Sequence, residues 1–380
     1  MNENELMSSL PVPKAVAKMA IPSVISSLVT VVYNMADTFF VGQTGDPLQV
    51  AAVSLTNPIF ILFMAFANMF GMGGSAAASM AMGEKNEKRM KQVSAFVTYA
   101  SLVVGVALAV ILMVFMTPVL NMFGANEQTF LYAKGYTFHI AYGAPFIIWS
   151  AAASFVVRAE GASKEAMIGI LSGVCVTGLP TAVFSMLMSV STIMLNQILV
   201  AYGNAPVAAI GIVFKANMFI TFLQMGLANG VQPLLGYNYG SGDHKRFVSV
   251  ERYTKKCCVI VGILATALFF VLREPIIRLF ISDGEVVYYG VKMLIAYMLS
   301  GPVIGLLFVN MNCMQSVGNS FPATILSVMR QGLLLIPLLY LLNACMGLNG
   351  VIYGQALTDY AAVILSAVLW RRIRRRIERR

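Results

Sequence analysis

Long apolar segments separated by short charged ones recur along the whole sequence. Most are about 20 residues or longer, enough to cross a bilayer as a helix, and inside lipid the need to pair every backbone N–H and C=O favours α-helices. Charged residues make up 11% of the 380 residues, whereas soluble domains carry about 25%. We therefore predict an all-α polytopic membrane protein with about ten transmembrane helices. The predicted spans are residues 16–41, 50–80, 93–120, 131–157, 172–202, 207–238, 253–280, 288–314, 322–344 and 349–370.

Lys and Arg residues mark alternate loops between these spans. The basic segments are the N-terminus, 83–92, 158–164, 240–256 and the tail 371–380. Because basic loops stay in the cytoplasm, we predict a multi-pass protein of the plasma membrane with both termini cytoplasmic. The basic tail then lies against anionic lipid, so the net charge of +10 indicates a membrane surface and no nucleic-acid partner.

The second half of the chain repeats the first. In one register the matched residues are Lys88-Arg89 with Lys245-Arg246, Pro118 with Pro275, and Pro145 with Pro302. Both copies begin on the same side of the membrane. They therefore predict two parallel, pseudo-symmetric helical lobes around a central cavity, an arrangement that some secondary transporters use.

The two copies differ in length. After Ser320 the second copy continues through two more spans, whereas only Lys164 to Gly178 follows the matching Ser163 before the next copy begins. We therefore predict a shortened N-terminal lobe of four helices over residues 1–172. The C-terminal lobe, residues 173–380, then has six helices and the basic tail.

A polar stripe runs down one face of the first predicted span. Its residues are Ser23, Ser27, Thr30, Asn34 and Asp37, spaced every three or four positions. Unpaired polar groups in hydrocarbon cost several kcal/mol each, so this face must meet protein or water. A carboxylate that binds and releases a proton or Na⁺ is one interpretation of Asp37; a solvated residue at the end of its helix is the other.

The matching helix of the second repeat, which starts near Pro180, keeps the polar stripe but has no acid. Thr192 and Asn196 belong to this stripe, and we expect them, with Thr30, to face the cavity. Ion coupling is therefore predicted for the first lobe. Asp359 also lies well inside a span, either as a cavity residue or as a structural acid that bonds two helices.

The densest motif is the run from Gly226 to Gly240. Its Pro233 removes a backbone hydrogen bond and kinks a helix, and its glycines allow close helix approach. Gln232 and Tyr237 are predicted to line the cavity. For the glycines we favour a packing role without ligand contact.

Several activities are excluded by what the sequence lacks. No Gly-x-x-x-x-Gly-Lys motif occurs, which argues against ATP-driven transport. No nucleophile with a matching base is evident, so we do not expect an enzyme. The five cysteines and two histidines show no metal-ligand spacing. The remaining prediction is transport driven by an ion gradient, with H⁺ or Na⁺ as coupling ion and no other cofactor.

At its motifs the chain resembles the multidrug and toxic-compound extrusion (MATE) transporters, in their bacterial NorM-like and DinF-like branches. The matching motifs are Asn34-Met-Ala-Asp37, Gly83 to Arg89, Arg158-Ala-Glu-Gly161, Ala228 to Gly240 and Gln315 to Ser320. The resemblance implies two lobes around a cavity and export of small organic cations or amphipathic drugs in exchange for H⁺ or Na⁺. It places Asp37, with Asn34 and Tyr33 beside it, in an ion site of the first lobe.

The chain departs from this family in the predicted number of helices, because members have twelve. The missing pair would supply partners of the first-lobe ion site. Two alternatives therefore stand beside drug export. One is a flippase for lipid-linked oligosaccharides, which the scarcity of Lys and Arg within the spans disfavours; the other is an inactive shortened remnant.

Overall fold

The structure is a computed structural model of the chain, and it describes residues 7–42, 47–123, 127–156, 187–188, 190–192, 194–281 and 283–377. Within these helices the side chains of residues 30, 33–42, 47–55, 57–58, 127–129, 154–156, 204, 376 and 377 lie outside the description. Every secondary-structure element in the described part of the chain is a helix. The predicted all-α fold is therefore confirmed.

The first lobe is built from five described helices. They are α2 (Val12–Gly42), α3 (Pro47–Gly83), α4 (Glu87–Val114), the short α5 (Met116–Met122) and α6 (Glu127–Val156). α6 packs against both α3 and α4. α4 begins where the side chain of Asn86 accepts a hydrogen bond from the backbone N–H of Arg89 at 3.0 Å, the usual arrangement of an N-cap.

The second lobe begins with the helical residues Val190–Val200. It continues through α8 (Asn204–Gly240), α9 (His244–Val271), α10 (Arg273–Arg278), α11 (Gly284–Met298), α12 (Gly301–Ser316), α13 (Phe321–Val328), η1 (Met329–Leu333), α14 (Leu335–Met346) and α15 (Leu348–Ile377). α9 begins like α4, with Asp243 accepting from the N–H of Arg246 at 2.9 Å. Asp243 occupies the position that the sequence repeat pairs with Asn86.

The same close helix contact occurs in both lobes. A Cβ atom added to Gly105 would lie 2.6 Å from the Cα of Pro145, and one added to Gly262 would lie 2.9 Å from the Cα of Pro302. The sequence repeat pairs Gly105 with Gly262 and Pro145 with Pro302. The repeat is thus visible as a shared packing contact, in which only glycine allows the neighbouring backbone so close.

Seven helices of the described residues are long and apolar enough to cross a membrane. An eighth span is formed if α11 and α12 are counted together across their 47° bend. Two of the ten predicted spans are not among these eight. One is α6, which is 30 residues long, and the other is 172–202, of which Val190–Val200 is described as helical.

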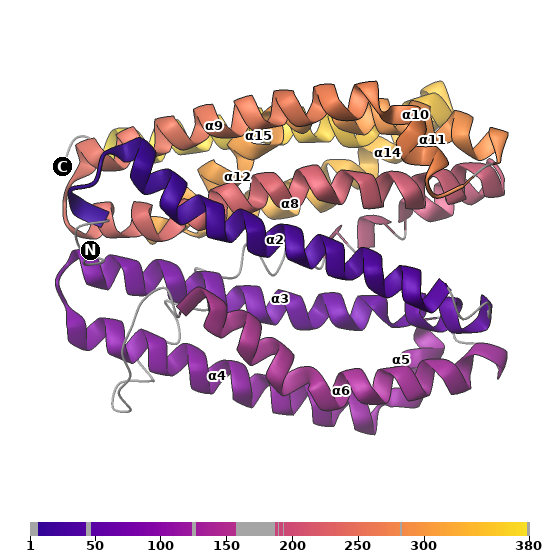
Figure 1. The fold of residues 1–380 in the computed structure, drawn as a ribbon, viewed down its shortest axis with the longest axis horizontal. Coiled ribbons are helices and arrows are strands. Elements are labelled where there is room, and N and C mark those ends of the chain that lie inside the picture. Colours follow the sequence, from indigo (N-terminus) through magenta and orange to yellow (C-terminus); the bar gives the residue numbers. More distant parts are fainter. Residues whose placement is uncertain are drawn as a thin grey trace.

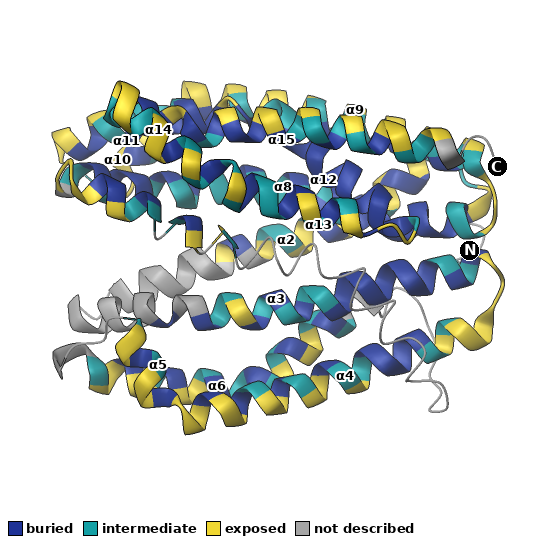
Figure 2. Ribbon diagram, turned by 180° about the vertical axis from the view of Figure 1, so that it is seen from behind, coloured by how far each residue is buried: buried dark blue, intermediate teal, exposed yellow. Residues whose placement is uncertain are grey.

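The two lobes lie side by side, with both ends of the chain at one end of the bundle, which we call the terminal end (Figure 1). We call the opposite end the far end. Exposed residues lie on the outside of both lobes (Figure 2). Many of them are large and apolar; Leu131 is 76% exposed, Val103 66% and Leu264 65%. Such a continuous apolar surface would be unstable in water and fits the hydrocarbon core of a bilayer.

The contact at Gly262 predicts a strong response to a small substitution. Gly262→Ala should lower the thermal stability of the purified protein in detergent, because the new methyl group meets backbone atoms and overpacking costs about 1–3 kcal/mol. The matched control is Gly135→Ala in α6, where no described atom lies within 4 Å. Equal melting temperatures for both variants would contradict this account of the contact.

Candidate functional site

The two lobes meet through glycines of α8. A Cβ on Gly230 would lie 2.7 Å from the carbonyl oxygen of Met19, and one on Gly226 would lie 2.9 Å from the Cα of Val24. Both neighbours belong to α2. α8 therefore presses its backbone against α2, as small residues allow in membrane helices.

Further toward the terminal end, α8 meets α3 in the same way. A Cβ on Gly236 would lie 3.0 Å from the Cβ of Ser79, Gly240 contacts the backbone of Met80, and Gly83 contacts the backbone of Tyr237. We call this contact of α8 with α2 and α3, from Gly226 to Gly240, the lobe seal. It closes the space between the lobes over the terminal half of the bundle. The favoured packing role of these glycines agrees with this geometry.

The lobe seal ends in a hydrogen-bonded hook at the N-terminus. Arg246 of the second lobe donates from Nε to the carbonyl of Met7 at 3.0 Å and from Nη2 to the carbonyl of Leu10 at 2.6 Å. Asn238 also donates to the carbonyl of Met7, at 3.4 Å. The repeat mate of Arg246 is Arg89, which instead forms an exposed ion pair with Glu84 at 2.9 Å. The hook therefore ties the first residues of one lobe to the other lobe.

A small pocket lies between the lobes at the inner edge of the lobe seal. It is lined by Met72 of α3, Met225 and Asn229 of α8, and Phe308, Met311, Asn312 and Gln315 of α12. Its volume is about 20 Å³, room for a water molecule. The lining combines thioether and aromatic side chains with amide groups.

The amides of this pocket are paired with one another. Asn312 donates from Nδ2 to Oδ1 of Asn229 at 3.0 Å. Directly behind, Gln232 donates from Nε2 to Oε1 of Gln315, also at 3.0 Å. Both bonds join α8 to α12, so the polar wall of the pocket is held rigidly by the second lobe.

A buried ion pair lies deeper in the second lobe. Arg330 donates from Nε to Oδ1 of Asp359 at 2.8 Å, and the two side chains are only 6% and 3% exposed. Gln355 donates to the same carboxylate oxygen at 3.0 Å. The guanidinium carbon of Arg330 lies 5.8 Å from the ring centre of Phe308. Phe308 also lines the small pocket between the lobes.

Arg330 lies in η1, a π-turn between α13 and α14. Such a turn releases backbone carbonyls from the regular helical pattern and is frequent at functional sites. The carbonyl of Gln331 accepts a hydrogen bond from the hydroxyl of Ser191, on the first helix of the lobe. The π-turn thus ties two helices together while it presents Arg330 to Asp359 on α15.

The predicted ion-coupling residues Asp37, Asn34 and Tyr33, and the predicted cavity residue Thr30, all belong to α2. Their side chains lie outside the described residues, so their roles remain predictions. They follow the part of α2 that forms the lobe seal, on the side of the far end.

The remaining predicted cavity residues are divided among different environments. Gln232 is fully buried behind the pocket, where it contacts Gln315, and Tyr237 is buried in the lobe seal. Thr192 bonds the carbonyl of Met188 in its own helix at 2.8 Å, and Asn196 is half-buried on the same helix. Asp359 pairs with Arg330, which favours the structural interpretation of this acid.

Sequence reasoning missed Arg330. A signal was available, because Arg330 lies well inside the apolar run 322–344, and a charge at such a position needs a partner. Asp359 is the acid in the following span. Membrane depth indicates that Arg330 needs a partner, but it does not by itself identify the helix that supplies it.

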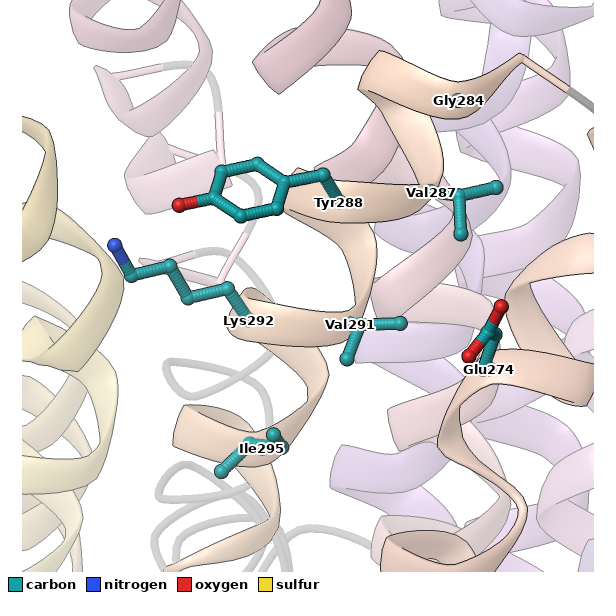
Figure 3. A pocket seen from close by; sticks show the side chains of 7 residues that line it. All are labelled: Glu274, Gly284, Val287, Tyr288, Val291, Lys292 and Ile295. Atoms are coloured by element: carbon teal, nitrogen blue, oxygen red, sulfur yellow. The ribbon is translucent and has the colours of Figure 1, made fainter.

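A second, larger pocket of about 400 Å³ lies on the outer surface of the second lobe at the far end. Residues of α10 and α11 line it: Glu274, Gly284, Val287, Tyr288, Val291, Lys292 and Ile295. Figure 3 shows Tyr288 and Lys292 on one side of α11, with Glu274 beyond Val291 on the other. This pocket is away from the lobe seal, and Glu274 is already paired with Arg278 at 2.8 Å.

Comparison with known families identifies two adjacent matches to one family model. The MatE model matches residues 22–184 and again 180–341. Together the two matches cover most of the chain, and they begin and end close to the register of the internal repeat.

Two curated relatives match nearly the whole chain. A multidrug export protein MepA from Staphylococcus haemolyticus is 27% identical, with 96% of this chain and 94% of the relative covered. The MepA protein of Staphylococcus saprophyticus is 26% identical, with 94% and 93% covered.

Solved structures of similar fold include an outward-facing multidrug resistance MATE family transporter of the MOP superfamily. It has a TM-score of 0.93, 18% identity, and 99% of each chain is covered. A MOP superfamily transporter from Pyrococcus furiosus also has a TM-score of 0.93 and 18% identity, with 100% of this chain and 99% of that chain covered. The TM-scores establish the shared fold, and at 18% identity the comparison shows the fold alone.

The Arg330–Asp359 pair predicts a specific pattern of stabilities. Arg330→Met should destabilise the protein by about 3–5 kcal/mol, because it leaves a buried carboxylate unpaired. Arg330→Met with Asp359→Leu should recover most of this loss, because replacing both charges with apolar groups is often neutral or stabilising. The measurement is a melting curve of each purified protein. If the double variant melts no higher than Arg330→Met, the pair does more than neutralise two buried charges.

Proposed function

The chain belongs to the MatE family, and on this basis we propose that it is a secondary active multidrug efflux transporter. The supporting observation is the pocket at the inner edge of the lobe seal, where two parallel lobes meet around a lining of methionine, phenylalanine and amide groups. Flexible methionine and flat aromatic surfaces suit varied apolar ligands. The curated relatives are named as multidrug export proteins, and the substrates that we propose for this chain are small organic cations and amphipathic compounds.

The proposed mechanism is alternating access. The lobe seal closes the terminal half of the bundle, and we infer from the basic loops at this end that it faces the cytoplasm. Export requires a second state in which this half opens and the far half closes, so that the pocket is reached from each side in turn. The lobe seal suits this movement because it is made of backbone contacts at glycines, and few side-chain hydrogen bonds must break when the lobes separate.

Asp37 is proposed as the residue that couples transport to an H⁺ or Na⁺ gradient. The supporting argument is its place on the polar stripe of α2. The N-terminal part of this helix packs against α8 at the lobe seal. Each charge that crosses a membrane potential of 100 mV supplies about 2.3 kcal/mol. Asp359 is a weaker candidate, because Arg330 already balances its charge.

The proposed division of the chain is four spans in the first lobe and six in the second, with the boundary near residue 172. The alignment with the Staphylococcus haemolyticus relative spans 428 positions, more than the 380 residues of this chain. It therefore contains positions that the relative fills and this chain does not, as a shortened lobe requires. The described residues that line the pocket include no Lys or Arg, which disfavours a flippase for phosphate-linked substrates.

Ion coupling is tested by Asp37→Asn in proteoliposomes. The wild type should export ethidium against its gradient when an H⁺ or a Na⁺ gradient is imposed, and the variant should lose at least nine-tenths of this rate because it cannot release a proton. Glu274→Gln, which neutralises an exposed acid at the far end, is the matched control. Wild-type export by Asp37→Asn would refute the role of Asp37, and absence of export in the wild type under both gradients would refute drug transport.

Opening of the lobe seal is tested with a reversible cross-link. A Cβ on Gly236 would lie 3.0 Å from that of Ser79, slightly shorter than the roughly 3.5–4.5 Å of a disulfide, so a shift of a few tenths of an ångström allows the bond. In a background without the native cysteines, Ser79→Cys with Gly236→Cys should stop ethidium export after oxidation and regain it after reduction. Each single-cysteine variant is the control. Undiminished export by the fully cross-linked protein would rule out a state in which this contact separates.

A further inference from the structure

A carboxylate is buried at the terminal end of the second lobe, where α9 approaches α15. Glu251 of α9 is only 1% exposed. Its Oε1 accepts a hydrogen bond from the indole N–H of Trp370 at 2.7 Å and an ion pair from Lys255 at 2.5 Å. Arg374 of α15 lies 3.5 Å from the other oxygen. One carboxylate thus holds two cations and fixes the end of α15 against α9.

This clamp, formed by Glu251 with Trp370, Lys255 and Arg374, sets the register and rotation of the two helices at the terminal end, whereas along the rest of their length both helices pack against α12. α9 runs away from the terminal end and α15 runs toward it (Figure 1). Where a residue of one helix contacts a residue of an antiparallel helix, the residues one and five positions later in each sequence lie on the same side of the helix pair. After Glu251 these positions are Arg252 and Lys256, and after Trp370 they are Arg371 and Arg375.

All four of these basic residues are on the surface. Arg252, Lys256, Arg371 and Arg375 are exposed, and none forms an ion pair with a described residue. Arg252 and Arg371 are each one residue from the clamp and therefore lie at the same depth. The other two lie about 7 Å above and below them along the bundle.

The outer faces of both helices change from apolar to basic at this level. On α9 the exposed residues above Lys256 are apolar and begin with Ile260 and Ile263. On α15 the exposed residues above Arg371 are Val368 and Ile364. The change marks the bilayer surface. The four cations are therefore at the depth of the lipid phosphates.

We propose that α9 and α15 form a binding site for the headgroup of an anionic phospholipid. Arg252 and Arg371 hold the phosphate between them, and Lys256 and Arg375 extend the positive surface on either side. The clamp at Glu251 is the positioning element, because it holds the ends of the two helices together. Its carboxylate pairs with Lys255 and Arg374, so these two cations are neutralised inside the protein. Arginine is suited to this role because its planar fork matches phosphate oxygens.

The chain offers its own reporter for this site. It has two tryptophans, and Trp149→Phe leaves Trp370, which is buried between the two helices beneath the proposed site, as a single fluorophore. The purified protein is placed in mixed bilayers in which either phosphatidylglycerol or phosphatidylcholine carries bromine on its acyl chains. We expect brominated phosphatidylglycerol to quench Trp370 at a mole fraction several-fold lower than brominated phosphatidylcholine.

Arg252→Gln with Arg371→Gln should reduce this preference by roughly tenfold or more, because each basic residue near a membrane surface adds about fivefold to anionic binding. Lys256→Gln with Arg375→Gln tests the flanking pair if the first variant does not fold. The matched control is Lys88→Gln with Lys91→Gln, which removes two exposed charges from α4. An equal loss in this control, or equal quenching by the two lipids in the wild type, would overturn the proposal.

A soluble competitor distinguishes a lipid from a free phosphate. sn-Glycerol 3-phosphate added at the same headgroup concentration should leave the quenching unchanged, because the acyl chains hold the lipid at this depth. Displacement of the brominated lipid by glycerol phosphate would show that the site recognises a free phosphate ester instead.

Discussion

The second lobe is organised by the need to pair every polar group that the chain carries into hydrocarbon. An unpaired amide or charge there costs several kcal/mol, so each must find a partner inside the protein. The partners come from different helices: Asn229 with Asn312, Gln232 with Gln315, and Arg330 with Asp359. Each pair therefore also fixes the distance and rotation of two helices, and together they make the lobe a rigid unit from α8 to α15.

The interface between the lobes follows the opposite principle. It is built from the glycines of α8 against the backbones of α2 and α3, where dispersion and close fit replace hydrogen bonds. Lipid and protein are equally apolar, so separating such surfaces costs little beyond the lost packing. Polar pairing within a lobe and smooth packing between lobes together produce two stiff bodies with a weak boundary. In the proposed alternating-access mechanism this combination lets the lobes rock without local unfolding. Arg246 and Asn238 at the N-terminal hook add directional bonds at the terminal end.

Local patterns predicted much of the fold, and tertiary pairing explains what they did not. Apolar length predicted the helices, and the repeat predicted two related lobes, because both signals lie along the chain; the contact of Gly105 and Gly262 with their prolines was seen only in the structure. From the glycines and the proline beside them, Gln232 and Tyr237 were predicted to line the cavity. The structure buries both side chains, since the same small residues that bend a helix also let α8 press against its neighbours. Arg330 was missed because a charge in an apolar run indicates that a partner exists without indicating which helix supplies it.

The two repeats have diverged in how they use charge. In the second copy the polar stripe has no acid. Its buried charges form ion pairs within the lobe, at Arg330 and at Glu251. In the first copy Arg89 remains at the surface with Glu84, while its mate Arg246 holds the N-terminus. A carboxylate can respond to an ion gradient only if no fixed cation already neutralises it. The internal pairing of Asp359 therefore argues that ion coupling falls to the first lobe, where Asp37 has no counterpart in the repeat.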